Sequence, residues 1–119
     1  MLRILIVEDD DAIREILHSY LCDYRLNREC KTAKTLSEAI KLVESEHFDL
    51  IFLDLLLQGE IATPVIENVH RLYVDNPPLI VVLSAMAGAT KIGAQFSVDK
   101  VITKPFDFES IDELVPMGK

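Results

Sequence analysis

Five polar side chains stand at the ends of short, largely apolar runs in the sequence, and their types fit phosphoryl-transfer chemistry. Three crowded carboxylates repel one another unless a cation neutralises them, and carboxylate oxygens beside open space suit Mg²⁺. Zinc is disfavoured because no cysteine or histidine pattern accompanies the acids. A lysine could bind a phosphoryl oxygen, a serine adds a hydrogen-bond donor, and a carboxylate could act as the nucleophile. The five residues are Glu8, Asp9, Asp54, Ser84 and Lys104.

The apolar runs that precede these residues indicate the strands of a parallel sheet. A run without polar alternation is typical of a strand that is buried on both faces. Such runs occupy residues 2–7, 49–54 and 79–83, and a shorter run occupies 101–103. The more polar segment 28–33 is predicted to be an edge strand.

Between the strands, the spacing of apolar residues changes to that of amphipathic helices. A first helix is predicted from Asp11, because apolar residues recur there at intervals of three and four. The residues of this apolar stripe are Ile13, Ile16, Leu17, Tyr20 and Leu21. Thr35 and Glu38 have capping-box spacing before a second helix. Pro64 suits the first turn of a third helix, which runs to about Tyr73. The residues predicted to face inward on this third helix are Val65, Val69 and Leu72.

Three further segments complete the predicted architecture. Residues 58–63 are predicted to form a loop, residues 85–97 at most a short helix, and residues 108–115 a brief last helix. Strands and helices then alternate five times, which predicts a parallel sheet with helices on both faces. Ligands of such sheets bind at the carboxyl ends of the strands, where the five polar residues fall.

Composition and charge favour an acidic, single-domain globular protein. The chain has 119 residues, of which half are hydrophobic. Its net charge of −8 argues against nucleic acid or an anionic membrane surface as a partner. No stretch has the length of a transmembrane helix and no signal peptide is evident, so we expect a cytoplasmic protein. Cys22 and Cys30 match no metal-binding spacing and are predicted to be free cytosolic thiols.

The pattern as a whole resembles the receiver domains of two-component response regulators, over essentially the whole chain, residues 1–119. The resemblance implies one flavodoxin-like (βα)5 domain of class α/β, a doubly wound five-stranded parallel sheet between two layers of helices. Four motifs carry it, each of modest specificity but together in the family's order and at near-family spacing. They are Ile4-Leu5-Ile6-Val7-Glu8-Asp9-Asp10, Asp49-Leu50-Ile51-Phe52-Leu53-Asp54, Val81-Val82-Leu83-Ser84-Ala85 and Thr103-Lys104-Pro105-Phe106.

The resemblance assigns roles to the polar residues. Asp54 resembles the phosphoacceptor, which attacks the phosphohistidine of a sensor histidine kinase or a histidine phosphotransfer protein. Glu8 and Asp9 resemble the acidic pair that holds Mg²⁺ together with Asp54. Leu56 would supply only its backbone carbonyl to the metal. Ser84 resembles the switch hydroxyl that hydrogen-bonds the new phosphoryl group.

The resemblance also implies how such a domain works. Lys104 resembles the lysine that contacts the phosphoryl group, and the peptide bond between Lys104 and Pro105 would be cis. Phosphorylation would switch the conformation of the domain and regulate a downstream protein partner, without direct contact to nucleic acid or a membrane. The domain would be a signalling switch that catalyses its own phosphorylation and dephosphorylation, not a metabolic enzyme. Homodimerisation stays open.

Several positions depart from the family pattern. Val101 stands where the aromatic switch residue is usual, and residues 57–62 lack the usual Pro and Asp-Gly of the loop after the acceptor. The interval from Ser84 to Lys104 is about two residues shorter than is usual, and the last helix is short. All of these except the loop change lie on the surface that most receivers use for output.

Two alternative functions stand beside the receiver domain. The first is a receiver-like protein-interaction module whose output switch has degenerated, which Val101 and the shortened fourth helix favour. The second is a phosphatase with an aspartyl nucleophile. Phosphatases of the haloacid dehalogenase type carry a second aspartate two residues after the nucleophile, where this chain has Leu56. The missing acid argues against the phosphatase.

Overall fold

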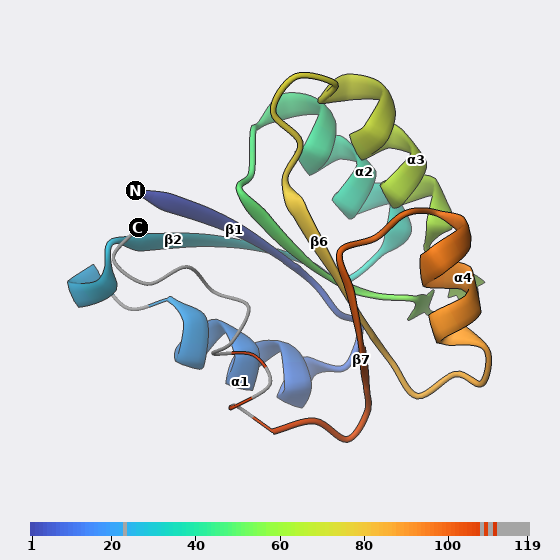
Figure 1. Cartoon of the computed structure of the whole chain (residues 1–119). Coiled ribbons are helices and arrows are strands. Elements are labelled where there is room, and N and C mark those ends of the chain that lie inside the picture. Colours follow the sequence, from blue (N-terminus) through green and yellow to red (C-terminus); the bar gives the residue numbers. More distant parts are fainter. Residues whose placement is uncertain (23, 108, 110, 112–119) are drawn as a thin grey trace.

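A parallel sheet of five strands forms the middle of the molecule (Figure 1). The computed structural model describes residues 1–22, 24–107, 109 and 111. The strand order β2-β1-β3-β6-β7 is that of a doubly wound flavodoxin-like sheet, which confirms the predicted fold class. The strands are β1 (Leu2–Val7), β2 (Arg28–Ala33), β3 (Leu50–Asp54), β6 (Leu79–Ser84) and β7 (Lys100–Thr103).

Helices cover both faces of this sheet. The helix α1 lies on one face, and α2, α3 and α4 lie on the other (Figure 1). None of the described helices has the length and apolar character needed to cross a membrane. The brief helix predicted at 108–115 falls on residues most of which lie outside the described part of the chain. The described helices are α1 (Asp11–Leu21), the short 3-10 helix η1 (Tyr24–Leu26), α2 (Leu36–Ser45), α3 (Thr63–Leu72) and α4 (Ala89–Gln95).

The hydrophobic core consists of two layers, one on each face of the sheet. Successive side chains of a strand point to opposite faces, so each central strand contributes to both layers. On β1, Leu5 and Val7 pack with α2 and α3, whereas Ile4 and Ile6 pack with Leu17 of α1. This double burial explains why the central strands appear in the sequence as unbroken apolar runs.

Local signals in the sequence set the helix starts. The carboxylate of Asp10 accepts a hydrogen bond from the Ile13 N–H at 3.0 Å, and so caps α1. The hydroxyl of Thr35 caps α2 in the same way, at 3.1 Å from the Glu38 nitrogen. The predicted capping box is only half formed, because the Glu38 carboxylate accepts from the Lys34 N–H and not from that of Thr35.

Three details of the sequence prediction were wrong. Residues 58–63 do not form a plain loop, because β4 (Leu56–Leu57) and β5 (Glu60–Ile61) pair as a short antiparallel hairpin before α3 begins at Thr63. Leu72 is 40% exposed, and Ile66 takes the inward place on α3. Ile16 of the first apolar stripe is 52% exposed.

The prediction that Cys22 and Cys30 are free thiols is also contradicted. The structure joins them by a disulfide with a Cα–Cα distance of 5.8 Å. Cys22 is the C-terminal cap of α1, and Cys30 lies in β2 opposite Ile4. A spacing of eight residues gives no local signal for this bond, because it is the packing of α1 against the sheet that brings the two sulfurs together.

Candidate functional site

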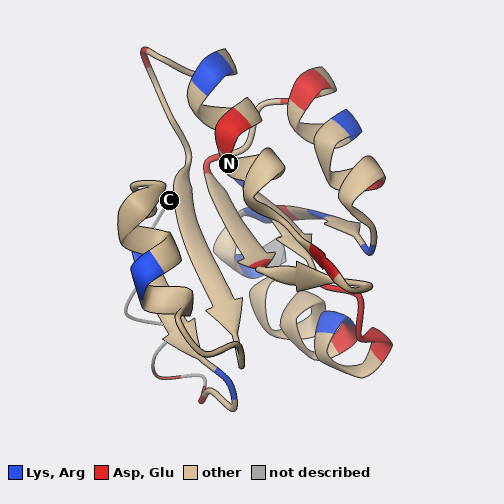
Figure 2. Cartoon of the chain, turned by 90° about the vertical axis from the view of Figure 1, so that its right-hand side faces the viewer, with Lys and Arg blue, Asp and Glu red and all other residues tan. Residues whose placement is uncertain are grey.

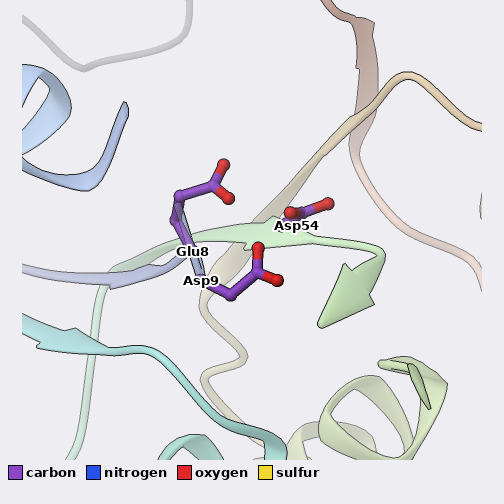
Figure 3. Close-up of side chains that lie close together, drawn as sticks. All are labelled: Glu8, Asp9 and Asp54. Atoms are coloured by element: carbon purple, nitrogen blue, oxygen red, sulfur yellow. The ribbon is translucent and has the colours of Figure 1, made fainter. Parts of the chain in front are cut away.

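Three carboxylates meet at the carboxyl end of the sheet (Figure 3). Glu8 and Asp9 follow β1, and Asp54 ends the neighbouring strand β3. Each can offer an oxygen within 4.8 Å of an oxygen from each of the other two. Val7 pairs with Leu53, so the parallel register brings the ends of β1 and β3 side by side. The sequence prediction that these acids converge is confirmed.

Lys104 neutralises part of this negative charge. It follows β7, and its ammonium group donates to a Glu8 carboxylate oxygen at 2.6 Å and to Asp54 Oδ2 at 3.3 Å. Burial alone would lower the pKa of Lys104, but the hydrogen bond and attraction of the two carboxylates outweigh burial and raise it. Lys104 is therefore a positive charge held beside Asp54.

Glu8 is the most deeply buried of the acids, with 1% of its surface exposed. Burial raises its pKa to about 7, because the ionised form loses its hydration; Lys104 opposes the shift, and Asp54 adds to it. The second Glu8 oxygen accepts from the Asp10 N–H at 3.2 Å. Glu8 thus changes its protonation state near neutral pH.

The hairpin β4–β5 holds Asp9 and Asp54. The Gln58 N–H donates to Asp9 Oδ2 at 2.9 Å, and the Leu56 N–H donates to Asp54 Oδ1 at 3.2 Å. Burial works to raise the pKa of Asp9, but the hydrogen bonds that it accepts, led by that from Gln58, hold its pKa below the usual value. The turn residues Gln58 and Gly59 both have positive φ, as a tight type I′ hairpin turn requires.

The hairpin was not predicted from the sequence, and it positions the predicted metal ligand Leu56. In an antiparallel pair, hydrogen-bonded and non-hydrogen-bonded residue pairs alternate. Leu55 accepts from the Ala62 N–H, so the next pair, Leu56 with Ile61, lies between ladder bonds. The peptide groups of Leu56 therefore face away from β5, which leaves its carbonyl oxygen outside the hairpin ladder. The Gly at the second turn position was the signal that could have revealed the turn.

The oxygen ligands fit Mg²⁺. Three carboxylates and a backbone carbonyl are hard donors, and fewer than six protein ligands leave positions for water or a phosphoryl oxygen. The crowding of like charges also favours a cation, because Lys104 offsets only one negative charge. The residues that would hold the metal are Glu8, Asp9, Asp54 and Leu56.

Ser84 ends β6, the strand that pairs with β3 on the side away from β1. Asp54 pairs with Leu83, so Ser84 lies one residue further along the neighbouring strand. It is 2% exposed, its hydroxyl oxygen accepts from the Met86 N–H at 2.9 Å, and its carbonyl accepts from the Lys104 N–H at 3.0 Å. The peptide bond between Lys104 and Pro105 is cis, as the resemblance implied.

The helix α4 packs closely against β7 next to the site. A Cβ atom on Gly93 would lie 2.5 Å from Cγ2 of Val101 and 3.0 Å from Cγ2 of Val98. Val101 is half-buried in this contact, at the position where the sequence analysis noted the missing aromatic residue. The short helix thus approaches β7 closely, with Gly93 against the Val101 side chain.

Comparison with known proteins agrees with this geometry. The family model for the response regulator receiver domain matches residues 4–116. The sensory transduction protein LytR of Staphylococcus haemolyticus is 29% identical over 96% of this chain and 44% of its own length. The chain spans about half the length of the curated relatives it matches.

Solved structures agree as well. Response regulator TrrA of Thermotoga maritima, in complex with Mg²⁺-BeF, is 29% identical, with a TM-score of 0.80 and 96% of each chain covered. A response regulator of Burkholderia pseudomallei with a phosphorylated aspartic acid, a calcium ion and citrate is 26% identical, with a TM-score of 0.82; the match covers 98% of this chain and 67% of that one.

Proposed function

The chain belongs to the response regulator receiver domain family, and we propose that it serves a two-component phosphorelay by accepting a phosphoryl group on Asp54. The donor is the phosphohistidine of a sensor histidine kinase or of a histidine phosphotransfer protein. The contact of Asp54 with Lys104, inside the cluster of three carboxylates, is the observation that supports the proposal most directly. The Mg²⁺-BeF complex of TrrA and the phosphorylated aspartic acid of the Burkholderia protein support the same chemistry.

The proposed transfer is an in-line displacement at phosphorus. An Asp54 carboxylate oxygen forms the new P–O bond, and the P–N bond to the donor histidine breaks with its electron pair left on the ring nitrogen. Lys104 moves from the free carboxylate to a phosphoryl oxygen, since its positive charge is already at this position. Mg²⁺, when held by Glu8, Asp9, Asp54 and the Leu56 carbonyl, supplies further neutralisation of the phosphoryl charge.

We propose that Ser84 hydrogen-bonds the phosphoryl group once it is attached to Asp54. Its hydroxyl now accepts from the Met86 N–H, and it can turn to donate to the phosphoryl oxygen from the adjoining strand end. A charge added next to a two-state element biases that element. The segment after β6 is the proposed element, and its shift regulates a downstream protein partner. In this role the domain acts in the cytoplasm as a switch, not as a metabolic enzyme.

One observation favours the receiver-like interaction module as the second candidate. Val101 fits tightly beneath Gly93, so α4 is tied to β7 by a small, rigid contact where an aromatic side chain would rotate in most of the family. A module of this kind would bind its partner equally well with and without the phosphoryl group.

The proposal is tested by intact mass spectrometry after incubation with Mg²⁺ and acetyl phosphate. We expect one added phosphoryl group on the wild-type protein and none on Asp54→Asn. Asp75→Asn is the matched control, because Asp75 is an exposed aspartate in the loop between α3 and β6. Equal labelling of Asp54→Asn and Asp75→Asn would refute the acceptor assignment. Uptake without any change in partner binding would select the interaction module.

A further inference from the structure

The two cysteines lie at a junction of the fold that the proposed phosphorylation does not use. Cys22 caps the C-terminal end of α1, and Cys30 lies in the edge strand β2. Their Cα atoms are 5.8 Å apart, within the range that disulfides occupy without backbone movement. The chain contains no other cysteine, so within one molecule this pairing is unique.

Backbone hydrogen bonds fix the end of α1 and the start of β2, where the two cysteines lie. The Cys22 N–H donates to the His18 carbonyl at 2.9 Å, which fixes the end of α1. The Leu2 N–H donates to the Asn27 carbonyl at 3.0 Å, which ties the start of β2 to β1. The short helix η1 lies between these two anchors. The thiols of a reduced chain would therefore stay near each other, at a high effective concentration.

The side chains of Cys22 and Cys30 are half-buried, and they pack against the core layer between α1 and the sheet. Partial exposure is a feature of disulfides that can be opened, whereas a fully buried one is protected from exchange.

We propose that Cys22 and Cys30 form a reversible redox modification site, oxidised by a low-molecular-weight disulfide. One cysteine thiolate attacks this disulfide to give a mixed disulfide and one released thiolate. The second cysteine then attacks the protein sulfur and releases the second thiolate. The two cysteine protons go to the two released thiolates, so the protein loses two hydrogens and the reagent becomes two thiols.

The bond is remote from the acidic cluster. Cys30 lies three residues before Ala33, whose carbonyl accepts from the Glu8 N–H, and three strand residues span about 10 Å. Cys22 lies at the other end of α1 from Asp11, about 16 Å away by the rise of a helix. Oxidation therefore links α1 to β2 covalently and leaves the proposed metal ligands in place. The redox site can thus be tested independently of phosphorylation.

The test exposes the reduced protein to a series of ratios of reduced to oxidised glutathione, followed by intact mass and peptide mapping without reductant. We expect a Cys22–Cys30 linkage at oxidising ratios, its reversal by reduced glutathione, and a Tm higher by roughly 5 to 15 °C in the oxidised form. Cys30→Ser is the matched control, because Cys22 alone should stop at the mixed disulfide with glutathione.

Three results would overturn the proposal. Thiols that stay reduced in oxidised glutathione would show that the pair does not form the bond. Mixed disulfides or covalent dimers in place of the internal linkage would show that the cysteines do not resolve each other. A linkage that a strong reductant opens, but that reduced glutathione leaves intact in the folded protein, would make the bond permanent and not regulatory.

Discussion

Glu8 experiences two opposing influences at the centre of the site. It is almost fully buried, which favours its neutral form, and it is paired with Lys104 at 2.6 Å, which favours its charged form. Burial is the larger effect and leaves the pKa of Glu8 at about 7. Asp9 differs, because the hydrogen bonds from the hairpin keep its pKa low. Two acids that are neighbours in sequence therefore titrate in different pH ranges.

Magnesium affinity should consequently depend on pH around neutrality. A proton on Glu8 competes with the metal, so binding below pH 7 must release that proton, and the affinity rises with pH until Glu8 is ionised. We expect a fall of up to about tenfold per pH unit below 7 and a plateau above 8. Calorimetric titration in buffers of different ionisation enthalpy measures both the affinity and the protons released.

Glu8→Gln is the control for this pH dependence. The variant keeps the shape of the side chain but has no proton to lose, so its weaker Mg²⁺ binding should be nearly flat between pH 6 and 8. Because Asp9 is ionised throughout this range, it adds no slope of its own. A slope as steep in Glu8→Gln as in the wild type would assign the titration to another group.

At the scale of elements, the contact between α4 and β7 depends on Gly93, which has no side chain. Gly93 lies where a Cβ atom would overlap Cγ2 of Val101, and a β-branched valine has little freedom to turn aside. The two positions are therefore coupled: the glycine allows a short helix to approach the strand, and the valine fills the space. The helix that makes this contact has only seven residues.

Gly93→Ala should destabilise the fold in spite of the better helix propensity of alanine. Overpacking costs about 1–3 kcal/mol, and replacing a helical glycine recovers about 1 kcal/mol, so we expect a net loss of about 1 kcal/mol. Urea unfolding followed by circular dichroism measures it. Adding Val101→Ala should make the glycine substitution less costly, because the closest contact is then gone and the contact with Val98, at 3.0 Å, remains. Additive effects of the two substitutions would contradict direct contact.

The elements that the sequence predicted correctly are those with a repeated local signal. The strands β1, β3 and β6 are buried on both faces and appear as apolar runs, and α1 begins at the predicted residue because Asp10 caps it. The convergence of the acids followed from topology alone, since parallel strands end at one edge of the sheet.

The features that were missed depend on contacts between distant residues or on a single unusual turn. The hairpin is held by two residue pairs and by a Gln-Gly turn, which is a weaker signal than Asn-Gly. The disulfide requires the end of α1 to pack beside β2, which no spacing of cysteines reveals. Ile16 matched the helical period and is exposed, because periodicity cannot show how wide the buried face is.

At the scale of the whole molecule, charge is separated from the core. Charged positions lie mainly on helices, loops, strand ends and the edge strand β2, and the middle parts of the central strands are uncharged (Figure 2). The net charge is −8, and the buried acidic residues Glu8 and Asp54 lie with Asp9 in the cluster at the strand ends. Self-repulsion of this kind lowers the stability of the folded chain, and it is greatest where β1 and β3 meet.

Mg²⁺ should therefore stabilise the fold as well as prepare the site. A ligand that binds only the folded state at one hundred times its Kd adds about 2.7 kcal/mol, or roughly 10 °C in Tm for a domain of this size. Differential scanning calorimetry checks this, with NaCl of equal ionic strength as the control for screening. Without Mg²⁺, Asp9→Ala should melt lower than wild type, because the hydrogen bond from Gln58 that holds the pKa of Asp9 low also stabilises the folded state. The variant should also lose most of the Mg²⁺ shift. If the Mg²⁺-induced rise in Tm were undiminished in Asp9→Ala, Mg²⁺ would be binding elsewhere. The repulsion within the acidic cluster would then destabilise the fold without being offset by a bound metal.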